Sequence, residues 1–167
     1  MACLGVHFAL TGEEVEKLRS FTTDSDRLNY LQTQIEETYF AGDAEYIAES
    51  DKAWDAMHRL LSDGELSYSD GPEPLRLTVI GGEPIYSAGD YIMSLKSPTQ
   101  VKAVSDALSV IDEAEFRRRY DRIDEAKYGF PKSSEDLEYT WSSFGGVVAL
   151  FKKAATQGRH VLFTADQ

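Results

Sequence analysis

Residues 50–64, with the sequence SDKAWDAMHRLLSDG, place Asp51, Asp55 and His58 along one short segment. Asp55 and His58 are three residues apart, so on a helix their side chains could share a ligand. Asp51 and His58 are about 10.5 Å apart along a helix axis, too far for one ion to bind both. Two ligands from one helix do not make a metal site, so we expect no metal here. The segment therefore predicts, at most, a pocket or a partner-binding surface beside Trp54.

The same residues also have structural explanations, which we favour over a site. Asp51 could cap the start of a helix, where a carboxylate complements the positive end of the helix dipole. Asp55 and Arg59 have the spacing of an i, i+4 ion pair. His58 lies about 40° around the helix from Trp54, so its ring could pack against the indole. On this interpretation the polar groups flank the apolar stripe of the helix and do not lie within it.

Two pairs of residues elsewhere are secondary candidates. His7 and His160 fall in the first and last predicted strands, and if these strands pair the two imidazoles could form a cluster that titrates near neutral pH. Two separate, half-buried histidines are the alternative that we favour. Gly81 and Gly82 could let the backbone approach a phosphate, but no G-x-G-x-x-G or G-x-x-x-x-G-K-[ST] pattern occurs. A turn is the favoured explanation of this glycine pair.

Two further patterns predict packing or solvation. Gly145-Gly146 lies inside a strongly apolar helical stripe, so we expect either a close approach of another element or a bend in the helix. Arg117–Arg119 follows Glu113 and Glu115 at i, i+4 spacing, which predicts a salt-bridged exposed face, with anion recognition as the alternative.

The chain contains no G-x-S-x-G, H-E-x-x-H, C-x-x-C or EF-hand pattern. Catalytic groups can assemble from distant positions, so the absence leaves enzyme activity open, although we lean against it. We expect no cofactor. The single cysteine, Cys3, excludes a disulfide within the chain and is compatible with a reducing cytosol. The N-terminal sequence does not resemble a signal peptide and no apolar run could span a bilayer, so we expect a soluble, cytoplasmic protein.

Charge is unevenly distributed along the chain. The net charge is −12, and residues 1–70 hold 15 of the 29 acidic residues but 5 of the 17 basic ones. An acidic field repels nucleic-acid phosphates and anionic membranes and attracts basic proteins. We therefore expect no nucleic-acid or membrane partner and consider a basic protein partner, although solubility alone could explain the charge.

The elements that must position these residues can be predicted from periodicity and caps. Alternation over residues 3–10 predicts a half-buried strand, and a capping box at residues 11–14 opens a helix. Helical spacing follows from residue 24 to about 39, and residues 50–64 form another helix with Ser50 or Asp51 as its N-cap. The later elements are expected in this order: a loop at 67–74, either a strand or a helix at 75–80, a strand at 91–95, a helix opened by a capping box at 97–100, a helix at 112–121, a helix from about 133 to Gly158, and a strand at 160–165.

This order predicts a single α+β domain over residues 1–167. In it a small mixed sheet, made of the terminal strands and a central strand near 91–95, is covered by about five or six helices.

The segment DKAWDAMHRLLSDG resembles the D-K-x-W-x-x-[LM]-H-x-L-L signature of the YfbM-like family of bacterial domains of unknown function. The segments VIGGEPI, VKAVSDALSVIDEAEFRRRYD and WSSFGGVVALFKKAATQGRHVLFTAD are similar to later parts of the same family. The resemblance implies an α+β bacterial domain. It supplies no catalytic residues.

Three functions remain. The favoured one is an acidic, non-enzymatic protein-binding module of an immunity or regulatory type, whose carboxylates around residues 43–55 meet a basic partner. The alternative is a small enzyme or small-molecule-binding protein with a cleft beside Trp54 and His58, in which Asp55 orients the imidazole. The third is a structural homo-oligomer, since the sequence leaves the oligomeric state open.

Overall fold

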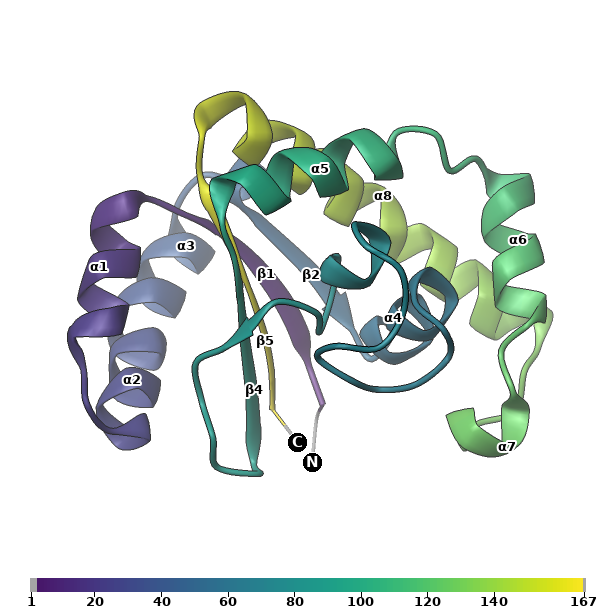
Figure 1. The fold of residues 1–167 in the computed structure, drawn as a ribbon, viewed down its shortest axis with the longest axis horizontal. Helices are drawn as coiled ribbons and strands as arrows, with labels where there is room; N and C mark the ends of the chain where they lie inside the picture. Colours follow the sequence, from purple (N-terminus) through teal and green to yellow (C-terminus); the bar gives the residue numbers. More distant parts are fainter. Residues whose placement is uncertain (1–2, 167) are drawn as a thin grey trace.

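The computed structural model describes residues 3–166 and contains one antiparallel sheet in the order β2-β1-β5-β4-β3 (Figure 1). Its strands are β1 (Gly5–Leu10), β2 (Ile47–Asp51), β3 (Glu83–Pro84), β4 (Tyr91–Lys96) and β5 (His160–Asp166). The α+β class is confirmed, and the terminal strands β1 and β5 do pair. We expected a mixed sheet, but every strand pair within the described residues is antiparallel. Strands β2 and β3 were not predicted.

Helices cover both faces of the sheet (Figure 1). One layer contains α1 (Gly12–Ser20), α2 (Asp24–Tyr30), the π-helical η1 (Leu31–Glu36) and α3 (Glu37–Ala41). The chain then continues through the short 3-10 helix η2 (Ala44–Tyr46) into β2. The other side carries α4 (Trp54–Leu61), the 3-10 helix η3 (Leu75–Leu77), α5 (Pro98–Leu108), α6 (Glu113–Asp121), α7 (Glu125–Tyr128) and α8 (Ser134–Gln157).

Strand β1 is buried along its whole length, whereas we expected it to be half-buried. Val6, Phe8 and Leu10 pack with the α1–α3 layer. His7 and Ala9 point to the opposite face, which the second helical layer covers. The side chains of β1 do alternate between the two faces of the sheet, but both faces are buried, and neither is exposed to solvent.

The predicted capping boxes are both present, because Thr11 bonds with Glu14 and Ser97 bonds with Gln100 in the reciprocal manner. The long closing helix, α8, ends as expected at Gly158, whose φ is +63°. None of the helices in residues 3–166 combines the length and apolar character needed to cross a membrane.

The start of α4 differs from the prediction. Residues 47–51 form the edge strand β2, and α4 begins at Trp54 after Ala53, which provides no side-chain cap. Ser50 is not a cap, because its hydroxyl donates a hydrogen bond to the carbonyl oxygen of Gly5 on β1 (3.2 Å). Pairing with β1 explains why the local sequence was misleading, since a strand partner cannot be seen in the segment itself.

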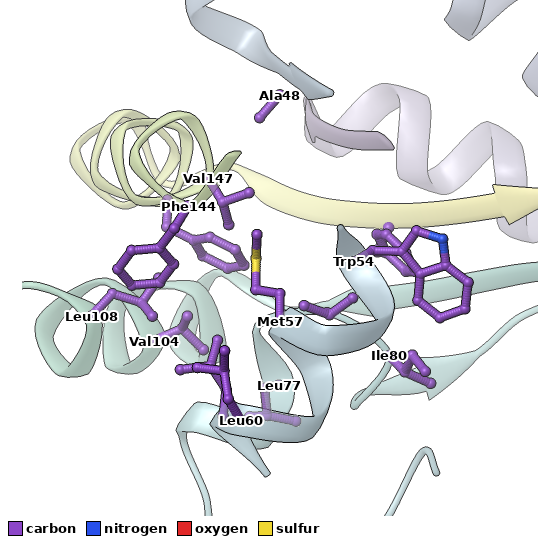
Figure 2. Packing of buried hydrophobic residues seen from close by; sticks show 14 of the residues in the cluster. Ala48, Trp54, Met57, Leu60, Leu77, Ile80, Val104, Leu108, Phe144 and Val147 are labelled. Atoms are coloured by element: carbon purple, nitrogen blue, oxygen red, sulfur yellow. The ribbon is translucent and has the colours of Figure 1, made fainter. Parts of the chain in front are cut away.

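Helix α4 docks through its apolar stripe, as predicted. Trp54 is 4% exposed and Met57 is fully buried. Figure 2 shows these residues and Leu60 in one cluster with Val104 of α5 and Phe144 of α8. This cluster fills the space between the sheet and the second helical layer.

Residues 75–80, for which strand and helix were left open, form η3 and then an irregular turn. Leu77 to Gly81 is buried, although residues 78–81 belong to no helix or strand. Buried backbone N–H and C=O groups outside regular structure need other hydrogen-bond partners. Side chains from β1, α4 and β4 supply them.

Candidate functional site

Asp51 and Trp54 make separate contacts. Asp51 is exposed at the end of β2, and its carboxylate accepts a hydrogen bond from the hydroxyl of Tyr139 (2.6 Å). Its φ of +44° lies in the left-handed region, which aspartate tolerates better than most residues. Trp54 is directed inward, and its indole N–H donates to the carbonyl oxygen of Cys3 (2.9 Å). These two candidate residues therefore do not converge on a ligand.

Asp55 and Arg59 form the expected i, i+4 ion pair, with 2.7 Å between Oδ1 and Nε. The Arg59 side chain is 7% exposed, so the pair is largely shielded from water. Burial raises the pKa of Asp55, and the adjacent guanidinium acts in the opposite direction. Asp55 thus holds Arg59 and is not in contact with His58.

His58 is fully buried, whereas we expected it at the edge of the apolar stripe. Its Nδ1 accepts a hydrogen bond from the backbone N–H of Ile80 (3.3 Å), and its Nε2 has no partner within residues 3–166. Burial, followed by the positive charge of Lys96, lowers the pKa of His58 to about 4. The aromatic neighbour of Trp54 is Phe163, with 5.8 Å between ring centroids.

His58 belongs to a set of four fully buried polar side chains, His7, His58, Ser94 and Lys96, which we call the buried polar cluster. They come from β1, α4 and β4. Register explains part of the arrangement, because His7 and Ser94 both lie opposite Phe163 on the central strand β5. Lys96, two residues after Ser94, therefore points to the same side of the sheet.

Each member of the buried polar cluster bonds one backbone group of the irregular segment 78–81. The pairs are His7 Nε2 with Thr78 O (2.8 Å), Lys96 Nζ with Val79 O, His58 Nδ1 with Ile80 N (3.3 Å) and Ser94 Oγ with Gly81 O (3.0 Å). Four consecutive residues without a strand partner are in this way satisfied by side chains. The cluster accordingly holds the segment in place.

The cluster contains no carboxylate. Lys96 also donates to the carbonyl and hydroxyl oxygens of Ser94 (3.1 Å each), and its Nζ lies 5.6 Å from the centre of the Phe163 ring. Burial lowers the pKa of Lys96 well below its usual value. Burial and the charge of Lys96 together lower the pKa of His7 to about 3, against the effect of its bond to Thr78.

A lysine amine with a lowered pKa beside a serine hydroxyl is a pair that can carry nucleophilic chemistry. A substrate would need access to it, however, and no member of the cluster lines any of five hollows found on the surface of residues 3–166. The same hollows do not include Trp54. Within residues 3–166, no group of three or more His, Cys, Asp and Glu side chains could hold a metal ion.

The glycine pair 81–82 forms the expected bend. A Cβ on Gly81 would lie 2.2 Å from the carbonyl oxygen of Arg76, and Gly82 has a φ of +131°. The backbone thus crosses other backbone at this point. Both glycines are explained by the path of the buried segment.

His7 and His160 do not meet. His7 is opposite Phe163, and His160 is opposite Leu10 at the other end of the paired strands. Residues that are an odd number of positions apart on a strand face opposite sides, so the two imidazoles lie on different faces of the sheet. Burial, followed by the charge of Arg19, lowers the pKa of His160.

Of the two explanations offered for the glycine pair 145–146 of α8, a close approach of another element is wrong. Both glycines are exposed, and a Cβ on either would meet no atom within 4 Å. The arginine run behaves as predicted, because Arg117 pairs with Glu113 (3.5 Å) and Arg119 pairs with Glu115 (2.8 Å).

The exposed carboxylates of residues 43–51 follow the edge of the sheet. Asp43, Glu45, Glu49 and Asp51, which we call the acidic edge, are all exposed and lead into or along β2. Glu45 pairs with Lys153 of α8 (2.7 Å). Glu49 and Asp51 have no ion-pair partner in the described part of the chain.

Exposed apolar side chains accompany the acidic edge. Tyr139, bonded to Asp51, is 39% exposed, and Leu4, which precedes β1, is 47% exposed. Strand β2 is the last strand of the sheet on this side, so β1 is its partner and its outer side faces away from the sheet. The edge therefore combines backbone, acidic and apolar groups.

Lys96 and Ser94 were not predicted as members of a site. The signal was available in part, because Ile92, Ser94 and Lys96 alternate with the apolar residues of the predicted strand 91–95. The predicted strand ended at Leu95, so Lys96 lay outside it.

Comparison with known proteins identifies relatives whose function is unknown. The family model described as "Domain of unknown function (DUF1877)" matches residues 1–164. The crystal structure of a protein of unknown function, YfbM from Escherichia coli, is similar with a TM-score of 0.67 and 19% sequence identity, over 97% of this chain and 99% of that chain. No curated protein matches. The likeness to YfbM shows a common fold.

Proposed function

The chain belongs to this family of domains of unknown function, DUF1877, and we propose that it is an acidic protein-binding module that docks a basic partner on its acidic edge. The partner would be of the kind met by immunity or regulatory proteins. The observation that carries the proposal is that Glu49 and Asp51 stand exposed on an edge strand without an ion-pair partner in residues 3–166. We also propose a cytoplasmic location, where a single free cysteine is stable.

Edge strands supply both affinity and register to an incoming chain. The outer backbone groups of β2 can bond an extended segment by strand addition, as in other peptide-recognition domains. Alternate side chains of such a segment would meet Glu49 and Asp51, so lysine or arginine at those positions fits. Tyr139 is an aromatic side chain of the type that often anchors interfaces.

Part of the charge elsewhere is paired within the chain. Arg59 pairs with Asp55, Arg27 with Asp24, and the arginine run with its own helix. The exposed carboxylates of β2 are thus available to a partner. No observation favours the alternative of an enzyme with a cleft at Trp54 and His58, because both side chains are enclosed by the core.

A synthetic peptide with alternating lysine and threonine residues tests the proposal. Its affinity is measured by fluorescence anisotropy, and the docking site is located by NMR shift perturbation. We expect shifts concentrated at residues 47–52 and binding that weakens steeply as salt is added. The double variant E49Q/D51N should bind several-fold more weakly.

The matched control is the double variant E16Q/D106N. Glu16 of α1 and Asp106 of α5 are exposed, lack ion-pair partners within residues 3–166, and lie outside β2. This variant removes the same charge and should bind nearly as well as the wild type. Equal weakening by both double variants, or shifts spread over the whole acidic surface, would contradict a specific edge site.

A further inference from the structure

A second feature of the molecule brings three arginine side chains together in an otherwise acidic protein. A hollow of about 220 Å³ lies where the C-terminal ends of α4 and α6 meet. Three arginines line it, Arg59, Arg119 and Arg122, together with Ser62. We call it the arginine hollow. It is separate from the acidic edge of β2.

Hydrogen-bond donors in the arginine hollow outnumber their internal acceptors. Arg59 uses Nε for Asp55 and Nη1 for the carbonyl oxygen of Gly64 (2.9 Å), and the structure gives its Nη2 no bond. Arg119 uses Nε for Glu115. Arg122 is exposed and forms no side-chain hydrogen bond or ion pair within residues 3–166.

Ser62 lines the arginine hollow and carries a hydroxyl group without an internal partner in residues 3–166. Its Oγ is buried and has no hydrogen-bond partner in the described residues. Buried hydroxyls are normally satisfied, so an unpartnered one calls for an explanation. The only carboxylate of the lining is Asp63, whose Oδ1 accepts the N–H of Glu65 (3.3 Å).

Contacts with neighbouring side chains hold two of the three arginines in place. Arg59 is 7% exposed, is fixed by Asp55 and lies 5.9 Å from the centre of the Tyr128 ring. Arg119 is fixed by Glu115. Guanidinium groups held in this way present planar forks of donors that match phosphate oxygens.

We propose that the arginine hollow binds the phosphoryl group of a small phosphate monoester. Several guanidinium donors and one hydroxyl match the multiple acceptors of a phosphoryl group better than the two of a carboxylate. The volume limits the size of the ligand, because pockets for drug-sized molecules measure about 300–1,000 Å³ and this hollow is smaller. A phosphoryl group with a short substituent fits the hollow.

The competing explanation is that these arginines stabilise helix ends. The C-termini of helices carry partial negative charge, and nearby arginines offset it. This accounts for the bond from Arg59 to Gly64. It does not account for the unpartnered hydroxyl of Ser62.

NMR titration of the full chain with inorganic phosphate and with methyl phosphate tests the proposal. Both are added at constant ionic strength, and acetate serves as the control anion. We expect saturable shifts at the backbone amides of residues 59–64 and 119–123 for both phosphates and none for acetate. Absence of saturation, equal binding of acetate, or binding of inorganic phosphate without methyl phosphate would overturn the proposal.

Two single variants complete the test. R122Q removes an exposed guanidinium of the hollow and should weaken binding by about tenfold or more, which is the usual effect of losing a bond to a charged group. R117Q removes the same charge from the same helix region outside the hollow and should bind as the wild type does. If R122Q binds normally, or if it lowers stability without changing affinity, the arginines serve the helix ends and the proposal fails.

Discussion

The acidic edge of β2 and the buried polar cluster beneath residues 78–81 both concentrate titratable side chains, but water reaches only the first. Glu49 and Asp51 keep their hydration and need no partner of opposite charge. His7 and Lys96 are fully buried, and their partners are neutral backbone groups. The difference shows how burial, and not residue type, decides whether a polar group stabilises this fold or remains free for binding.

Acidification should have the largest effect on the free energy of unfolding, and this effect arises in the buried polar cluster. The pKa values of His7 and His58 are lowered from 6.5 to about 3 and about 4. Between those values and 6.5 the unfolded chain binds more protons than the folded chain, so the free energy of unfolding falls as the pH falls. From about pH 7.5 to about pH 5 we expect a loss of about 2 kcal/mol per histidine. Urea unfolding at the two pH values measures it.

The variants H58Q and H160Q test how much a buried histidine contributes to the pH dependence of stability. H58Q should lose about 2 kcal/mol less than the wild type over the same pH interval, because one buried titration is removed. H160Q alters a partly exposed imidazole whose pKa is also lowered, so it should reduce the pH dependence by less than H58Q does. Burial raises the pKa values of Glu36 and Asp55, which act with the opposite sign, but these groups are common to all three proteins. A wild-type pH dependence in H58Q would show that His58 does not titrate as described.

Removal of the buried amine should have the next largest effect. K96M keeps the length and apolar character of the side chain but leaves the carbonyl oxygens of Val79 and Ser94 without this donor. Unpaired buried acceptors cost about 1–3 kcal/mol each, partly offset by the end of burying an amine. We expect the free energy of unfolding to fall by about 2–3 kcal/mol at an unchanged m value.

The control for this variant is K102M on α5. Lys102 is exposed, so its replacement should change the free energy of unfolding by less than about 0.5 kcal/mol. Stabilisation by K96M would mean that Lys96 is not needed to satisfy the segment 78–81. A role for the lysine in chemistry would then become the stronger explanation.

The parts of the fold that could be predicted are those that local chemistry specifies. Thr11 and Ser97 each start a helix through a reciprocal cap, and Gly158 ends one by adopting a positive φ. The apolar stripe of Trp54 and Met57 was likewise correctly assigned to the core. Such signals depend on neighbours within one or two helical turns.

The parts that could not be predicted depend on distant neighbours. Residues 47–51 become a strand through pairing with β1, more than 35 residues earlier in the chain. Lys96 ends a strand, where a lysine is usually solvated, and it is buried because residues 78–81 cover it. His58 was placed at the edge of the apolar stripe of α4 and not in the core for the same reason, since the segment that covers it is irregular and has no periodicity to recognise.

The smallest effect on the free energy of unfolding is expected at the acidic edge. E49Q/D51N removes two charges from exposed positions, where substitutions usually change the free energy of unfolding by less than about 0.5 kcal/mol. Asparagine also accepts the positive φ of residue 51 and can keep the bond from Tyr139. Urea unfolding and peptide binding are measured on the same preparation. Weaker binding with unchanged stability would make the edge a surface kept for a partner, whereas a loss of more than about 1 kcal/mol would make its carboxylates structural, like the groups of the buried polar cluster.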